Sequence, residues 1–83
     1  LRNLDMRGAN FEVADMQRVN LRGAKLAGAV LRQADLLGAD MTGADLTGAD
    51  FGGARLQSAV LTDAVLDGTK FAGAIMPGGE VAP

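Results

Sequence analysis

The 83-residue sequence contains no cysteine, histidine, tyrosine or tryptophan. Without cysteine the chain forms no disulfide and offers no thiolate to a metal ion. The side chains that most often act as general base or nucleophile in enzymes are also missing. No apolar run approaches the length of a membrane-spanning helix, and no secretion signal opens the chain. We therefore expect one soluble domain, with the cytoplasm favoured, that has no enzymatic activity, no cofactor, no metal site and no membrane contact.

Large hydrophobic residues recur at every fifth position from Leu1 to Met76, which makes sixteen consecutive positions. This column contains all four methionines and all three phenylalanines of the chain. The residue two before each hydrophobe is usually alanine, the residue between them is usually aspartate or asparagine, and the residue two after is usually glycine. The repeating unit is thus Ala-Asp-Leu-x-Gly, as in residues 44–48 with threonine at x.

A period of five fits neither a helix nor a single strand. On an α-helix, five residues advance the chain by about 500°, so that successive hydrophobes would lie about 140° apart and form no stripe. On a strand, an odd period would send alternate hydrophobes to opposite faces. The pattern instead predicts a chain that turns a corner in every unit and points each hydrophobe inward, with glycine at the corners because it accepts positive φ.

These features resemble the pentapeptide-repeat family, and the resemblance covers residues 1 to about 78. It implies an all-β fold, a right-handed quadrilateral parallel β-helix of about four coils with four pentapeptides in each. Phe11, Phe51 and Phe71 differ by multiples of twenty and would then stack on one side. We expect the β-helix to occupy residues 1–78 and residues 79–83 to form a disordered tail, because Pro77 and the two following glycines interrupt the repeat.

Charge is distributed unevenly along the chain. Residues 1–32 carry six basic and three acidic side chains, whereas residues 33–67 carry one basic and six acidic side chains. An acidic belt is expected on all four sides of the coil, formed by Asp35, Asp40, Asp45 and Asp50. We interpret these aspartates first as a solvated outer surface with ordinary ionisation. Glu12 is expected to lie beside Arg32, and Asp15 beside Asp35 with Arg55 next in line.

Both ends of the predicted coil stack carry unusual residues. Outward positions should be polar, yet Val60, Val65 and Ile75 place apolar side chains around the last coil. Either a neighbouring domain or a second copy covers them, or they are scattered surface hydrophobes of the kind that need no partner. Leu4 replaces alanine in the first coil and is expected to plug the leading end. Because the chain begins inside the repeat at Leu1, we expect it to be part of a longer protein or a processed product.

The sequence favours a rigid, non-catalytic rod that acts as a protein-protein interaction or spacer module. Its predicted contact surface consists of Asp35, Asp40, Asp45, Asp50, Val60, Val65 and Ile75. The expected partners are another protein, a neighbouring domain, or a second copy bound end to end, without direct binding of nucleic acid, because all phenylalanines are predicted inside.

Two alternatives remain open. The family resemblance implies that an acidic rod can mimic DNA and regulate a type II topoisomerase such as gyrase, although a net charge of −2 is far below that of duplex DNA. A carboxylate-based hydrolase would require two aspartates close together in a cleft.

Overall fold

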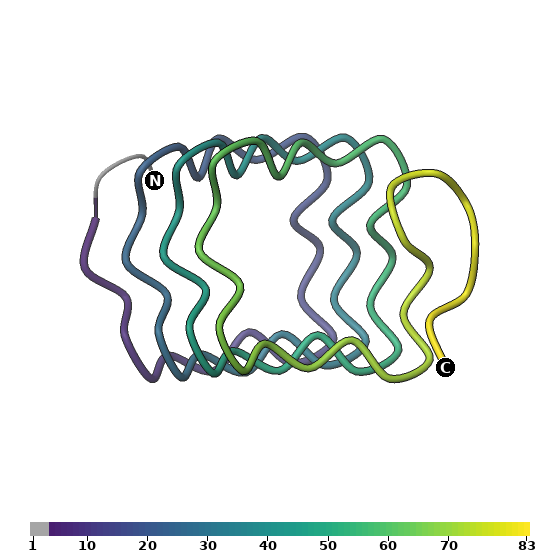
Figure 1. Ribbon diagram of the computed structural model, residues 1–83, viewed down its shortest axis with the longest axis horizontal. Helices are drawn as coiled ribbons and strands as arrows, with labels where there is room; N and C mark the ends of the chain where they lie inside the picture. Colours follow the sequence, from purple (N-terminus) through teal and green to yellow (C-terminus); the bar gives the residue numbers. More distant parts are fainter. Residues whose placement is uncertain (1–3) are drawn as a thin grey trace.

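The backbone turns a corner every five residues and returns above itself after four corners (Figure 1). The computed structural model describes residues 4–83. Parallel bridges join residues twenty apart, from Asp5 with Lys25 to Arg55 with Ile75, so one coil contains four pentapeptides. Within residues 4–83 there is no helix, and each strand is a single bridge residue between two-residue turns. The fold is therefore a parallel β-helix solenoid.

Each coil is joined to the next by a regular pattern of backbone hydrogen bonds. The N–H of Leu46 donates to the carbonyl of Val65, nineteen residues later, at 2.9 Å. The N–H of Asp45 donates to the carbonyl of Ala24, twenty-one residues earlier, also at 2.9 Å. Because the same pattern repeats on every side of the interior coils, their backbone groups are satisfied as in a parallel sheet.

The corners explain the glycine column. At Gly48 φ is 67°, and the N–H of Ala49 closes the turn on the carbonyl of Leu46 at 2.9 Å. A positive φ only at the third residue of such a turn is the pattern of a type II turn, which favours glycine there. All fourteen corners from residue 8 to residue 73 have positive φ, and five of them use Val13, Arg18, Gln33, Ser58 or Asp63. The prediction of glycine at the corners is confirmed, and the corner geometry also forms without glycine.

The hydrophobic column fills the interior as predicted. From Leu21 to Leu56 every member is fully buried, and so is every column alanine from Ala24 to Ala54. Burial decreases at both ends: Leu66 is 42% exposed because no further coil covers it within residues 4–83. Leu4, at the other end, is 47% exposed, and its role in covering that end stays a prediction. Leu1 lies outside the described residues.

The bridges define four sides, which we number in chain order. The outward residues are Asp5, Lys25, Asp45 and Val65 on the first side; Asn10, Val30, Asp50 and Lys70 on the second; Asp15, Asp35, Arg55 and Ile75 on the third; and Asn20, Asp40 and Val60 on the fourth. Phe11, Phe51 and Phe71 follow the outward residues of the second side, as predicted. The rings of Phe51 and Phe71 stack with centroids 5.3 Å apart and planes 12° from parallel.

Residues 77–82 fold back onto the third side of the last coil, as the yellow segment in Figure 1 shows. Val81 forms an antiparallel bridge with Ile75, and the N–H of Ala82 donates to the carbonyl of Ala74 at 2.9 Å. This differs from the disordered tail expected for residues 79–83. Pro77 does end the repeat, but Gly79, with φ of 93°, reverses the chain and lets it pair with the open edge.

The molecule is a squat block. Its extents are 28 × 22 × 19 Å, so no dimension greatly exceeds the others. The rod predicted from the sequence is therefore about as long as it is wide. Within the described residues no helix is long and apolar enough to cross a membrane.

Candidate interaction surface

The four aspartates of the acidic belt lie on four different sides. Asp35 belongs to the third side, Asp40 to the fourth, Asp45 to the first and Asp50 to the second. They point outward as predicted, and no two of them converge on one site. No group of three carboxylates in the described part of the chain is placed to hold a metal ion, and no cavity was found there. The geometry offers no cleft in which two carboxylates could act on a substrate.

Each belt aspartate stabilises the corner that follows it. The Oδ1 atom of Asp45 accepts hydrogen bonds from the backbone N–H of Thr47 at 3.1 Å and from its hydroxyl at 2.6 Å. Asp40 makes the same two contacts with Thr42, and Asp50 accepts from the N–H of Gly52 at 2.9 Å. These are Asx turns, which orient the peptide entering the corner.

Three belt aspartates also pair with arginines of neighbouring coils. Asp40 lies 3.2 Å from Arg22, Asp50 lies 3.2 Å from Arg32, and Asp35 lies 3.9 Å from Arg55. Arg55 therefore offsets the negative charge of Asp35, as expected because the two residues are consecutive on the third side. Glu12 does not pair with Arg32 as expected, because Arg32 reaches the other way to Asp50. The belt is thus largely neutralised by its own molecule.

Hydrogen bonding keeps several of these carboxylates ionised. The pKa of Asp45 and that of Asp40 are lowered, first by the hydroxyl of the following threonine and then by its backbone N–H. The pKa of Asp50 is lowered chiefly by the N–H of Gly52. At the leading end the Arg7 side chain, and then its backbone N–H, lower the pKa of Asp5 from 3.8 to about 2. Asp40, Asp45 and Asp50 are thus ionised as expected, but their pKa values lie below the ordinary value for aspartate.

Gly52 is a buried residue that sequence reasoning missed. A Cβ atom at this position would lie 2.8 Å from Nη1 of Arg32 and 3.1 Å from Oδ1 of Asp50. The missing side chain leaves space for the guanidinium to lie across the corner and reach the carboxylate. The sequence signal for Gly52 was the Gly-Gly pair at residues 52–53, since a turn with positive φ only at its third residue, here Gly53, requires only one glycine.

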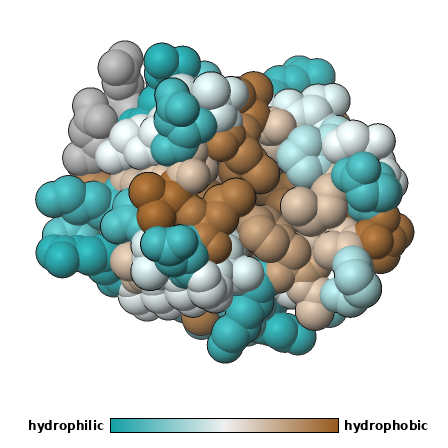
Figure 2. Space-filling model, in the orientation of Figure 1, coloured by the Kyte–Doolittle hydropathy of each residue, from teal (hydrophilic) through white to brown (hydrophobic). Residues whose placement is uncertain are grey.

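The apolar residues of the last coil form a partly open rim. Val60 is 40% exposed on the fourth side, and Val65 is 43% exposed on the first. They adjoin Leu61 and Leu66, two residues of the inward column that are only partly buried. Figure 2 shows apolar side chains gathered in the middle of one face of the molecule. Ile75 is only partly exposed because the folded-back segment pairs with it. The structure thus separates Ile75 from the two exposed valines with which the sequence grouped it.

The repeat, the coil and the inward column together define a parallel β-helix repeat protein. The family model described as pentapeptide repeats matches residues 1–33, 14–53 and 40–78, with eight copies. The chain belongs to the pentapeptide-repeat family.

Two solved pentapeptide repeat proteins are similar to the chain. One, from Nostoc PCC 7120, is 40% identical with a TM-score of 0.61, over 84% of this chain and 62% of that one. The other, from the thylakoid lumen of Arabidopsis thaliana, is 28% identical with a TM-score of 0.55, over 87% of this chain and 46% of that one. The chain thus spans less than two thirds of the length of either protein. A search of curated proteins gave no match.

Proposed function

We propose that this protein is a non-catalytic interaction module that presents the apolar rim of its last coil, Val60, Val65 and Leu66, to a protein partner or a neighbouring domain. We infer a right-handed β-helix of about four coils as the rigid support of that rim. The observation that carries the proposal is the combined exposure of these three side chains, each at least 40%, beside a coil edge that is only partly covered. Exposed apolar groups of this kind, when contiguous, mark contact surfaces.

The dimensions favour interaction over spacing. A spacer must separate its two ends, and a block of 28 × 22 × 19 Å separates them by little more than its own width. The belt aspartates Asp35, Asp40, Asp45 and Asp50 contribute less to contact than the sequence suggested, because three of them already pair with arginines. The same pairing weakens the case for DNA mimicry, which needs a net negative surface.

Affinity capture from a lysate of the source cell tests the proposal. The immobilised parent protein should retain a specific partner, and Val60→Asp together with Val65→Asp should lose it, because two charges would enter the apolar contact. Val13→Asp is the matched control, since Val13 is 66% exposed but lies in the first coil. Retention of the same proteins by the parent and both variants, or of none by the parent, would count against the proposal.

A further inference from the structure

The last coil ends in backbone groups that nothing pairs within the described residues. On its first two sides the N–H groups of Leu66, Gly68 and Phe71 donate no hydrogen bond, and the carbonyls of Ala64 and Thr69 accept none. One coil earlier, the corresponding N–H groups of Leu46, Gly48 and Phe51 all donate to the last coil. The open edge, which we define as residues 64–71, therefore retains the pattern that joins two coils, and no residue of the described 4–83 continues that pattern beyond it.

The first coil offers the complementary pattern. Within the described residues the carbonyls of Asp5, Arg7 and Asn10 accept no backbone hydrogen bond, and the N–H groups of Asp5 and Asn10 donate none. The outward residues of the first side are spaced by twenty, at positions 5, 25, 45 and 65. The next position in this series would be 85, and residue 5 of a second copy would take that place. In that register each unpaired backbone N–H or carbonyl of the open edge lies opposite one partner in the second copy. The residue offsets are the same as between interior coils.

The hydrogen bonds can be assigned one by one. The N–H groups of Leu66, Gly68 and Phe71 would donate to the second copy's carbonyls at positions 5, 7 and 10, nineteen residues on in the shared register. The carbonyls of Ala64 and Thr69 would accept from its N–H groups at positions 5 and 10. Five bonds would then join the first two sides.

The side chains agree with this register. Leu66 and Phe71 are incompletely buried in the last coil, and Met6 and Phe11, which would cover them, are incompletely buried in the first. Phe11 of the second copy would extend the Phe51–Phe71 stack, whose centroids are 5.3 Å apart. Apolar surface that is open at both ends would thus be removed from water.

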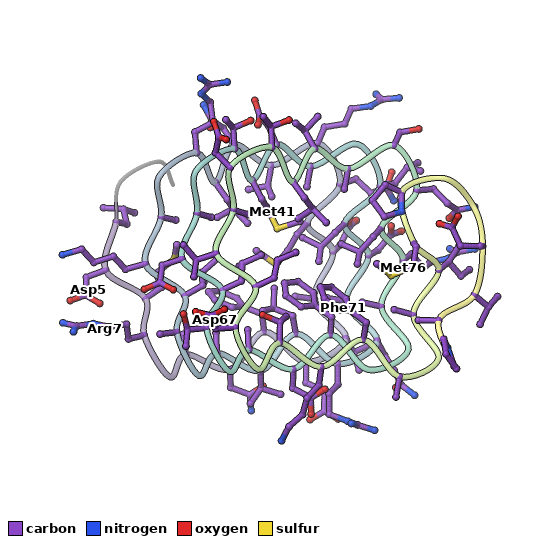
Figure 3. All side chains as sticks on the ribbon, viewed as in Figure 1. Asp5, Arg7, Met41, Asp67, Phe71 and Met76 are labelled. Atoms are coloured by element: carbon purple, nitrogen blue, oxygen red, sulfur yellow. The ribbon has the colours of Figure 1, made fainter. Side chains whose placement is uncertain are left out.

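The charges at one corner also agree. Arg7 and Asp67 belong to one column of corners, stacked coil upon coil. Backbone hydrogen bonds join successive corners of this column: Gly8 donates to Ala27, Gly28 to Thr47, and Gly48 to Asp67. Figure 3 shows Arg7 and Asp67 toward the same edge of the molecule. In the shared register, Arg7 of the second copy, which also pairs with its own Asp5 at 2.6 Å, would follow directly after Asp67 and place opposite charges together.

The segment of residues 77–82 occupies the third side of this end. The N–H groups of Gly73 and Met76 already donate to the carbonyls of Ala82 and Glu80, at 3.0 and 2.7 Å, and the carbonyl of Ala74 accepts from Ala82. A coil seated on all sides would need these same groups. The segment therefore competes with a second copy for the third side.

We propose that the open edge docks the first coil of a second copy head to tail, and that the segment of residues 77–82 opposes this contact by covering the third side. The inference rests on the proposed interaction role and names the partner as another copy of this chain. Because the two surfaces differ, the contact is heterologous and continues into a chain of copies unless an end is covered.

Sedimentation velocity over a wide concentration series tests the proposal. Ala82→Pro in the full chain removes the N–H that holds the segment to Ala74, and Val81→Pro is a second way to release it. Both should raise the average mass with concentration, while the parent stays near the monomer. Far-UV circular dichroism shows whether each variant keeps the fold.

Charge variants establish the register. In the Ala82→Pro background, Asp67→Arg should weaken association about tenfold, because it sets two arginines together. Arg7→Asp added to Asp67→Arg should restore association, whereas Gln33→Arg, far from both ends, should leave it unchanged. The proposal is overturned if both released variants stay monomeric while folded, if the parent associates as strongly as they do, or if Asp67→Arg has no effect. Such a failure leaves the interaction role itself intact, because that role is tested separately through Val60 and Val65.

Discussion

At the scale of the residue, the fold depends on one torsion angle in five. Every corner between residues 8 and 73 has a positive φ, which glycine accepts without cost and other residues accept only with strain. Val13 is the extreme case, since it is β-branched, has φ of 63° and is 66% exposed. It therefore bears the conformational penalty with little gain from burial.

Val13→Gly should raise the free energy of unfolding by about 1 kcal/mol, because relief of the strained φ exceeds the entropic cost of glycine. The converse change, Gly43→Ala, should lower it by a similar amount: φ there is 69°, and the open space around the position leaves strain as the main effect. Urea unfolding followed by circular dichroism measures both. Stability changes of the same sign in the two variants would contradict this account of the corners.

At the scale of the element, the repeating unit is an Asx turn followed by a type II corner. Where an aspartate precedes the hydrophobe, it is not simply a solubilising residue, because its carboxylate accepts a hydrogen bond from a backbone N–H of the corner, as Asp45 does from Thr47. The sequence could predict the corner and the inward hydrophobe, since both follow from the period of five. It could not predict the Asx contact or the reach of Arg32 to Asp50, because these depend on side-chain rotamers and not on spacing.

Acid should destabilise the protein through these turns. The pKa values of Asp40, Asp45 and Asp50 are lowered on folding, so their stabilisation is complete above the unfolded value and is lost as the pH falls through the folded one. The free energy of unfolding should therefore decrease below about pH 4. Asp45→Asn keeps the acceptor oxygen but not the charge, so its unfolding free energy should depend less on pH than the parent's in the same urea titrations. An equally steep acid loss in this variant would count against the role of Asp45.

At the scale of the whole molecule, the two ends differ from the middle. The interior coils bury the hydrophobic column as predicted, and the larger departures of backbone and burial occur where residues 4–83 supply no neighbouring coil: Leu4 and Leu66 are exposed, and residues 77–82 fold back. The repeat specifies contacts between one unit and the next, and it carries no information about a unit whose neighbouring coil is outside residues 4–83. The ends therefore had to be learned from the structure, and they are where the proposed contacts lie.

The central claim is that residues twenty apart are neighbours while residues ten apart lie on opposite sides of the coil. Cysteine pairs test it directly, because the chain has no cysteine of its own. The Asp45→Cys/Val65→Cys variant, whose two positions are bridged, should be joined efficiently by a short thiol-reactive cross-linker. The Asp45→Cys/Arg55→Cys variant, closer in sequence but on opposite sides, should not. Equal cross-linking of the two variants, or cross-linking only of the second, would contradict the four-sided coil.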